Sequence, residues 1–410
     1  MRRAFTGMAA VAALTVYFPA AASAATTSTP TTSTAITTHG SSVPSWTIQP
    51  VPLPPGATNA YLPAVSCPSA ASCTAVGSRF ETWTNRPWRV TEGELAEHWN
   101  GSTWTTQATS RPADEGATGT LSGVSCTSAA SCTAVGDYQN RSGNYLTLAE
   151  HWNGRSWAIQ ATPTPPAVAF VSLKGVWCTS AASCTAVGYY ATGLTSGPGA
   201  TLVEYWNGST WTIQPTPHPS GAEVSILTGV WCASAASCTA VGYSVGTSQA
   251  SLTLAERWNG SIWTIQPTPR PSGSTSSALS GVSCTTTASC TAVGGAIESP
   301  NTRLTLAEHW NGSTWTIQPT PTPSGPIDDS TGLHAVSCTS VNRCTAVGEF
   351  GKGALAERWN GTKWEQQHTT SPASHKLLYA VSCTSSRTCT AVGGTPGNIY
   401  RSDQPLAEHE

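Results

Sequence analysis

The feature that most constrains this chain is a unit of about fifty residues that recurs seven times. Its approximate form is L-x-G-V-S-C-x5-C-T-A-V-G, followed by L-A-E-x-W-N-G-S-x-W-T-I-Q-P-T-P. Successive first cysteines are 59, 52, 54, 52, 54 and 45 residues apart. A repeat of this length, with several short β-type runs and no helical period, is typical of the blades of a β-propeller.

Each unit contains four segments expected to form antiparallel strands. They are the run that ends in G-V-S-C, then C-T-A-V-G, L-T-L-A-E-H-W and S-T-W-T-I-Q-P-T, all rich in strand-forming residues. The N-G dipeptide between the third and fourth segments predicts a two-residue type I′ turn, as at Trp99–Ser102. Such a turn places Glu97 opposite Trp104, on the same face as Trp99. Because proline cannot donate to a ladder, the Pro-rich run after the fourth segment suits an outer edge strand.

The two ends of the repeat array complement each other. Six units contain a full W-N-G-x-x-W hairpin, whereas the seventh reaches only Leu406–His409. The missing half, S-W-T-I-Q-P, stands at Ser45–Pro50. We therefore predict an all-β, seven-bladed propeller over residues 45–410, in which Leu406–His409 pairs antiparallel with Trp46–Gln49 and closes the last blade.

The first 24 residues are expected to be a signal peptide. Arg2 and Arg3 precede an apolar run, and Ala22–Ala24 offers a cleavage site. Residues 25–44 are rich in Thr, Ser and Pro and are expected to be a disordered lead-in. No second apolar run of about 20 residues could span a bilayer. These features predict a secreted, extracellular protein, which we expect to be a monomer.

All fourteen cysteines fall into C-x5-C pairs. An even number of cysteines in an exported chain favours disulfides, and the short spacing predicts local pairing worth roughly 2 kcal/mol per loop. Redox chemistry and zinc binding are the alternatives, but reactive dithiols are usually C-x-x-C, and structural zinc takes four ligands. The predicted bonds are Cys67–Cys73, Cys126–Cys132, Cys178–Cys184, Cys232–Cys238, Cys284–Cys290, Cys338–Cys344 and Cys383–Cys389.

The charged residues exclude several classes of function. Without Arg2 and Arg3, 17 basic side chains face 21 acidic ones, so the mature chain lacks the basic field that nucleic acid binding requires. No H-E-x-x-H, G-x-S-x-G, P-loop or strand-linked G-x-G-x-x-G motif occurs, so we expect no metal and no cofactor. The glutamate of L-A-E recurs in every unit, which favours a structural role over catalysis. Its seven copies are Glu97, Glu150, Glu204, Glu256, Glu308, Glu357 and Glu408.

Sequence variation is concentrated between the second and third segments of each unit. The longest such stretch, at residues 78–94, is not repeated elsewhere and adds two tryptophans. Function concentrates on loops that a rigid scaffold holds, and aromatic side chains there can stack on sugars or anchor a protein. The predicted ligand-binding residues are Trp83, Arg86, Trp88, Tyr138, Tyr189, Tyr243 and Tyr400. The first hypothesis is therefore a non-catalytic binding or scaffolding module for an extracellular glycan or protein.

Two other functions stay open. A glycoside hydrolase or polysaccharide lyase would use acids of the same variable rim, and two or three carboxylates or a histidine should then converge on the centre of the ring. The candidate acids are Glu81, Asp137, Glu298, Glu349 and Asp403. A structural surface protein without a small ligand is the third hypothesis.

The runs L-A-E-H-W-N-G-S-T-W-T-I-Q-P-T-P and G-V-S-C-T-S-A-A-S-C-T-A-V-G resemble secreted bacterial repeat proteins expected to be β-propellers. This resemblance covers nearly all of the mature chain and implies the fold without implying a chemistry. The hairpin is also distantly similar to the Asp-box of sialidase-like propellers, S-x-D-x-G-x-T-W, through Gly101, Thr103 and Trp104. Trp99 stands at the position of the defining aspartate, so no catalytic residue carries over.

Overall fold

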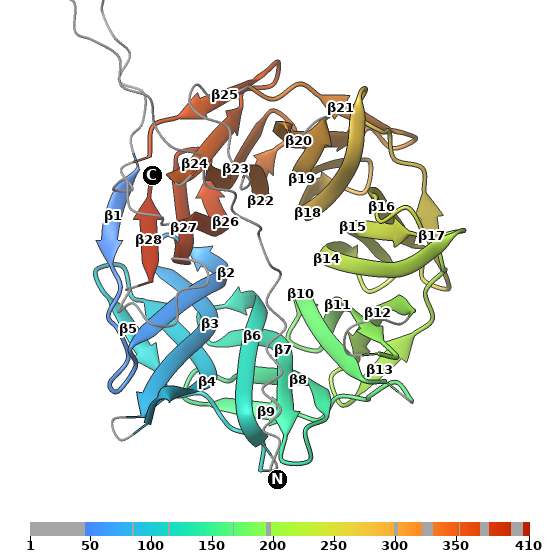
Figure 1. The fold of residues 1–410 in the computed structure, drawn as a ribbon. Coiled ribbons are helices and arrows are strands. Elements are labelled where there is room, and N and C mark those ends of the chain that lie inside the picture. The colour runs from blue at the N-terminus through green and yellow to red at the C-terminus, as the bar shows by residue number, and fades with distance from the viewer. Residues whose placement is uncertain are drawn as a thin grey trace, which may run out of the picture. The chain divides into compact units, whose positions relative to one another are not determined.

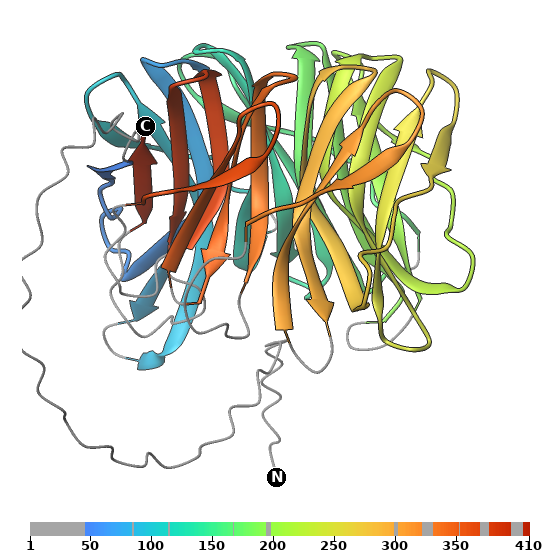
Figure 2. The ribbon, with the colours of Figure 1, turned by 90° about the horizontal axis from the view of Figure 1, so that it is seen from above.

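The structure, a computed structural model, is a seven-bladed β-propeller, as predicted (Figures 1 and 2). It describes residues 46–83, 86–113, 115–166, 168–193, 198–298, 302–321, 331–351, 353–369, 377–394 and 405–410. The predicted signal peptide and lead-in lie outside these residues. Residues Pro44–Glu410 form one compact unit. In its described part, seven four-stranded antiparallel sheets are arranged around a common axis.

The blades follow one another along the chain, and each begins at the axis. The innermost strands are β2 (Asn59–Ser69), β6 (Glu115–Ser128), β10 (Phe170–Ser180), β14 (Ala222–Ser234), β18 (Ser274–Thr286), β22 (Gly332–Ser340) and β26 (Leu377–Ser385). The second strands are β3 (Ser72–Trp83), β7 (Ser131–Asn140), β11 (Ser183–Ala191), β15 (Ser237–Gly246), β19 (Ser289–Glu298), β23 (Arg343–Phe350) and β27 (Thr388–Gly394). The third strands are β4 (Arg86–Trp99), β8 (Tyr145–Trp152), β12 (Gly199–Trp206), β16 (Ser251–Trp258), β20 (Thr302–Trp310), β24 (Gly353–Trp359) and β28 (Leu406–His409). The outermost strands are β5 (Trp104–Gln107), β9 (Trp157–Gln160), β13 (Trp211–Gln214), β17 (Trp263–Gln266), β21 (Trp315–Gln318), β25 (Trp364–Gln367) and β1 (Thr47–Pro50).

The predicted closure of the last blade is confirmed. Strand β1 pairs antiparallel with β28, with Thr47 opposite His409 and Pro50 opposite Leu406 (Figure 1). The ladder runs one residue further along the chain than the predicted segment, because Trp46 lies just before it with a fully buried ring. The indole N–H of Trp46 donates to Oε1 of Gln367 in the neighbouring blade at 3.2 Å.

The hairpin between the third and fourth strands differs from the prediction. Trp99 lies directly opposite Trp104, so the loop has four residues instead of a two-residue type I′ turn. Only Gly101 has a positive φ, of 95°. The side-chain oxygen of Asn100 accepts the backbone N–H groups of Ser102 and Thr103, both at 3.0 Å, and so holds the loop. The predicted shared face survives, because a shift of two residues preserves the strand pleat.

The W-T-I-Q motif joins neighbouring blades at six of the seven interfaces, whereas the indole N–H of Trp315 has no hydrogen-bond partner in the described part of the chain. The indole N–H of Trp104 donates to Oε1 of Gln49 at 3.0 Å, which joins blade 1 to strand β1 of the last blade. The same contact recurs around the ring. It joins Trp157 to Gln107, Trp211 to Gln160, Trp263 to Gln214, Trp364 to Gln318 and Trp46 to Gln367. The motif is therefore explained by packing between blades.

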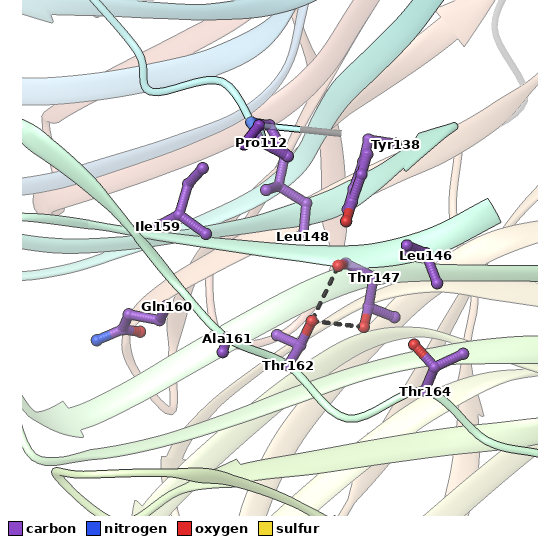
Figure 3. A pocket seen from close by; sticks show the side chains of 11 residues that line it. Pro112, Tyr138, Leu146, Thr147, Leu148, Ile159, Gln160, Ala161, Thr162 and Thr164 are labelled. Atoms are coloured by element: carbon purple, nitrogen blue, oxygen red, sulfur yellow. Dashed lines mark hydrogen bonds between the residues drawn. The ribbon is translucent and has the colours of Figure 1, made fainter. Parts of the chain in front are cut away.

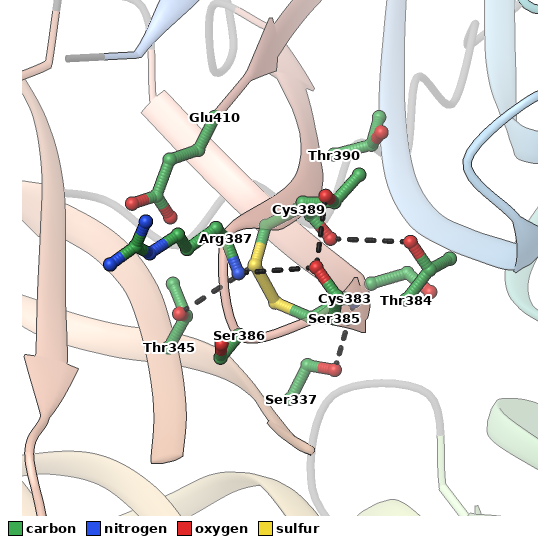
Figure 4. Close-up of a disulfide and its surroundings, with 12 residues drawn as sticks. Ser337, Thr345, Cys383, Thr384, Ser385, Ser386, Arg387, Cys389, Thr390 and Glu410 are labelled. Carbon is green, nitrogen blue, oxygen red and sulfur yellow. Dashed lines mark hydrogen bonds between the residues drawn. A yellow bond between two sulfur atoms is a disulfide. The ribbon is translucent and has the colours of Figure 1, made fainter. Parts of the chain in front are cut away.

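All seven predicted disulfides are present. In the last blade, the N–H of Cys383 donates to Oγ of Ser337 at 3.0 Å, and Sγ of Cys389 lies 3.7 Å from Oγ1 of Thr345 (Figure 4). Both partners belong to the preceding blade, so the disulfide turn also stabilises an interface. The C-x5-C turns and the W-N-G loops lie at the same end of the blades, which we call the disulfide rim. The opposite end is the variable rim.

Candidate functional site

Every innermost strand contains a β-bulge two residues before the valine of its V-x-C run, and the bulged side chain is half-buried near the axis. The hydroxyl of Thr228 donates to the carbonyl oxygen of Leu279 in the next blade at 2.9 Å. Bulged side chains therefore reach from blade to blade around the axis. These residues, the bulge ring, are Pro63, Ser122, Lys174, Thr228, Ser280, His334 and Tyr379.

A second ring lies on the variable-rim side of the first. It consists of the residue that follows C-T-A-V-G on each second strand, where the nearly constant part of the repeat ends. We call it the rim ring, and its members are Ser78, Asp137, Tyr189, Tyr243, Gly295, Glu349 and Gly394. A Cβ atom on Gly394 would lie 2.9 Å from Cβ of Tyr61, so glycine at this position makes room for the Tyr61 side chain.

Blades 1 to 3 bring acids, a lysine and tyrosines together at these two rings. Oγ of Ser172 donates to Oδ1 of Asp137 at 2.5 Å, and Asp137 is only 6% exposed. Nζ of Lys174 lies 5.8 Å from the ring centroid of Tyr189, within the range of a cation–π contact. Glu92, on β4, is close enough to Lys174 and Asp137 for their charges to act on its carboxyl group.

The other side of the axis carries a histidine between aromatic and acidic neighbours. The ring of His334 stacks on Tyr379 with centroids 5.4 Å apart and planes 10° apart. Its Nδ1 lies 3.1 Å from the carbonyl oxygen of Leu378, and its Nε2 lies 3.5 Å from Oε1 of Glu349. Tyr379 in turn meets Tyr61 edge-on at 6.4 Å. This contact connects the two halves of one cluster, the axial site, formed by Tyr61, Glu92, Asp137, Lys174, Tyr189, His334, Glu349 and Tyr379.

Burial shapes the acid–base chemistry of the axial site. Desolvation raises the pKa of Asp137 above its ordinary value, while the charge of Lys174 opposes this shift. Desolvation likewise raises the pKa of Glu92, with a further contribution from Asp137. The pKa of Tyr61 rises to about 12, through burial first and the nearby Glu92 second. Carboxyl groups of raised pKa can donate as well as accept hydrogen bonds, and neutral tyrosines can do the same.

The structure places four of the sequence-predicted residues in or beside the axial site. Tyr189 and Tyr243 are both in the rim ring and half-buried, and burial followed by the charges of Asp137 and Tyr243 raises the pKa of Tyr189 to about 12. Asp137 and Glu349, predicted as acids of a possible enzyme, also belong to the rim ring. They come from non-adjacent blades, and their contacts differ: Asp137 binds Ser172, whereas Glu349 lies beside His334.

Tyr138 lies elsewhere, in a cleft of about 300 Å³ on blade 2 (Figure 3). Leu146–Leu148 and Ile159–Thr162 form much of its wall. Its polar floor is the hydrogen bond between the hydroxyls of Thr147 and Thr162, at 2.9 Å. The same threonine pair recurs as Thr201–Thr216, Thr253–Thr268 and Thr305–Thr320. Because four blades share it, this contact serves the blade and does not identify a ligand site.

The other predicted residues do not join the axial site in the described part of the chain. Glu81 forms an ion pair with Arg79, and Glu298 ends strand β19. The side chains of Trp83, Arg86 and Trp88 lie outside the described residues, as do Tyr400 and Asp403, so their roles stay predictions.

The stretch expected to be a loop at residues 78–94 is largely a long hairpin of β3 and β4, because its Phe, Thr, Trp and Val residues extend the ladder. Sequence reasoning missed Tyr61, Glu92, Lys174, His334 and Tyr379. Three of these are bulge-ring residues, and the signal that could have found them was available. The position after the leucine of L-x-G-V is Ser or Thr in three units, but Lys, His and Tyr in three others.

Within the described ranges, no cluster of three or more His, Cys, Asp or Glu side chains is arranged to hold a metal ion. In the same part of the chain, no helix has the length and apolar character needed to cross a membrane.

No family model and no curated protein matches this chain. Solved structures do resemble it. YCF48 bound to a D1 peptide is 13% identical, with a TM-score of 0.50, over 90% of this chain and 97% of that one. A PL25 ulvan lyase bound to a GlcA–Rha3S glycan is 8% identical, with a TM-score of 0.51, over 85% and 94%. Trypanosoma rangeli sialidase is 9% identical, with a TM-score of 0.45, over 86% and 54%. At these identities the likeness shows one thing about this chain: it has the fold of the β-propellers.

Proposed function

We propose that this protein is a secreted, non-catalytic binding propeller that holds an extracellular glycan at the axial site. The observation that carries the proposal is the convergence of Tyr61, Tyr379, Lys174 and Asp137 at one end of the axis. Half-buried rings with a few fixed polar groups are the composition of a small-ligand site. Three blades have Ser or Thr at the bulge position of Lys174 and Tyr379, and three have Ser or Gly at the rim-ring position of Asp137, so the repeat itself does not require these side chains.

A glycan suits the groups that are present. Tyrosine rings can cover the apolar faces of a sugar, while the Lys174 ammonium group and the Glu92 carboxyl group, whose pKa is raised, can exchange hydrogen bonds with its hydroxyls. Ser172 is fully buried and holds Asp137 in place through its hydrogen bond. Seven disulfides suit an oxidising, extracellular environment. Of the similar folds, one was solved with a glycan and one with a peptide. A peptide is therefore the competing ligand.

A glycan array with the purified mature protein tests this function. It should contain neutral, uronic and sulfated chains, and a peptide array should be run beside it. We expect Lys174→Ser to weaken glycan binding by about tenfold or more, because a polar anchor of the site is lost. Serine occupies the same bulge position in blades 2 and 5, as Ser122 and Ser280, so the fold should tolerate it.

Thr228→Ser is the matched control, since it changes a bulge-ring residue of blade 4 outside the axial site and should leave binding unchanged. Glycan binding that survives Lys174→Ser intact would remove the axial site from the proposal. Selective binding to peptides would identify a peptide, and not a glycan, as the ligand. Trp83→Ala and Trp88→Ala, tested on the same array, are expected to weaken binding if the β3–β4 hairpin extends the site.

A glycan hydrolase or lyase is the second candidate, favoured by one observation. Glu92 and Asp137 both have raised pKa values and both act electrostatically on Tyr61, as acids and bases in an active site do. Incubation with each array-positive polysaccharide, followed by assays for reducing ends and unsaturated products, separates the two functions. We expect no product. Product that disappears with Glu92→Gln would establish the enzyme instead.

A further inference from the structure

Two tryptophans interrupt a hydrogen-bond pattern that otherwise runs around the disulfide rim. In five blades, the residue before the first cysteine is a serine whose hydroxyl accepts the backbone N–H of the first cysteine in the following blade. The contacts join Ser66 to Cys126, Ser125 to Cys178, Ser283 to Cys338, Ser337 to Cys383 and Ser382 to Cys67, at 2.9–3.0 Å. In the other two blades this position is Trp177 and Trp231.

The substitutions stand in adjacent blades, and their side chains meet. The ring centroids of Trp177 and Trp231 are 6.1 Å apart, with planes inclined by 44°. Ser125, at the equivalent position one blade earlier, is 7% exposed and fits within the interface between blades. An indole is far larger than a serine side chain. Trp177 is accordingly 37% exposed, while Trp231 packs against the core of the following blade.

Tryptophan at these two positions costs stability, and the fold does not require it. It gives up two inter-blade hydrogen bonds and leaves part of an indole in water. The five serine blades show that the ring closes without it. An exposed indole beside a half-buried one offers a ligand an aromatic surface, and the half-buried ring holds the exposed one in place.

The surroundings indicate the charge of the ligand. The segments around the two rings, residues 175–184 and 229–238, contain no charged residue. The neighbouring exposed side chains are small or hydroxylated, such as Thr179, Ser180 and Ser234. A charged ligand would therefore find no counter-charge in these segments. A neutral sugar would find rings for its C–H faces and hydroxyls for its edges.

We propose that Trp177 and Trp231 form a second carbohydrate site, which binds an uncharged sugar at the disulfide rim. It is separate from the axial site. Trp177 stands three residues beyond Lys174 on β10, toward the opposite rim. The proposal does not depend on the function of the axial site.

Titration with neutral hexasaccharides of glucose, xylose and N-acetylglucosamine, followed by tryptophan fluorescence and calorimetry, tests the site. We expect one or more of them to bind, and Trp177→Ser and Trp231→Ser each to weaken that binding by about tenfold or more. Both changes restore the residue of the other blades. The melting temperature of Trp177→Ser should therefore stay unchanged or rise, which separates lost binding from lost folding. Trp231→Ser also removes packing against the core of the next blade, so its melting temperature is expected to fall and is measured beside its binding. Trp177→Phe, which keeps a ring, should retain most of the affinity.

Lys174→Ser is the matched control and should leave this binding intact, whether or not it abolishes binding at the axial site. The proposal fails if none of the three sugars binds at millimolar concentration, or if Trp177→Ser binds as well as the native protein. Sedimentation velocity adds another outcome that would overturn it. A dimer that Trp177→Ser dissociates would show that the rings bind a second copy of the chain.

Discussion

Replacing Trp46 with alanine is expected to destabilise the propeller by about 3–5 kcal/mol, the usual cost of removing a large buried aromatic side chain. Trp46 is fully buried, packs in the core with Leu378 and Leu406, and donates a hydrogen bond to Gln367. It also anchors β1, the strand that closes the ring. No covalent connection joins β1 to the rest of its blade. The loss of this anchor therefore weakens the seam, the pairing of β1 with β28 that closes the ring, and also leaves a cavity.

Guanidinium unfolding followed by circular dichroism measures this effect. Ile48→Ala is the matched control, because Ile48 lies on β1, the strand that Trp46 precedes, and is 45% exposed, so its loss should cost about 0.5 kcal/mol or less. Trp211→Ala removes an equivalent indole from a blade whose strands are continuous in the chain. Trp46→Ala should cost at least as much as Trp211→Ala. A Trp46→Ala protein as stable as Ile48→Ala would contradict the role given to the seam.

The protein is also expected to lose stability as the pH rises from about 6.5 to 8. The glutamates of the L-A-E motif are fully buried, and desolvation raises the pKa of Glu97 to about 7 and of Glu204 to about 8. It also raises those of Glu256, Glu308 and Glu357 to about 8 and that of Glu408 to about 7. The folded state thus holds protons that the unfolded state releases near pH 4.5. Each such group lowers the free energy of unfolding by up to about 1.4 kcal/mol per pH unit within this window.

Histidines act in the opposite direction below pH 6.5. Burial lowers the pKa values of His98, His151, His309 and His409, so the unfolded state takes up more protons from these groups as the pH falls. Their effect offsets part of the glutamate effect between pH 4.5 and 6.5. Above pH 6.5 the histidine effect fades and the buried carboxyl groups dominate, so melting temperatures at pH 6.5, 7, 7.5 and 8 should fall steadily.

Glu308→Gln isolates the contribution of a single glutamate to this pH dependence. In the described part of the chain, neither carboxylate oxygen of Glu308 has a hydrogen-bond partner, so an amide of the same shape loses no contact. The variant should match the native protein near pH 5, where Glu308 is protonated in the fold, and exceed its stability at pH 8 by about 1 kcal/mol or more. A native protein whose stability is constant or rises from pH 6.5 to 8 would show that these carboxyls are ionised without cost.

The fold was easier to predict than the site, because the sequence signals for the fold lie within short segments and recur in each repeat. The C-x5-C pairs are neighbours in the chain, and the seam followed from comparing Ser45–Pro50 with Leu406–His409. The hairpin turn was misjudged because N-G was taken as a type I′ pair. The Asn100 side chain instead accepts two backbone hydrogen bonds that hold a four-residue loop. The turn preference of an N-G dipeptide takes no account of such side-chain contacts.

Tyr138 and Tyr189 show why the candidate site was only partly foreseen. Both follow C-T-A-V-G and were given one role, but Tyr189 is the first residue after the motif and Tyr138 the second. In a pleated strand, successive side chains point to opposite faces. Tyr189 therefore reaches the axial site, whereas Tyr138 lines the cleft on its own blade.

By itself, the sequence determined the number of blades, the strand content of each blade, the disulfides and the closure of the ring. The reason is that the same strand, turn and cysteine signals recur in every repeat. Only the tertiary structure decided which of the residues that differ from the repeat consensus come together in space. Tyr61, Asp137, Lys174 and Tyr379 are far apart in the chain and belong to four blades. They converge because the bulges and pleats of separate strands are brought into register around one axis.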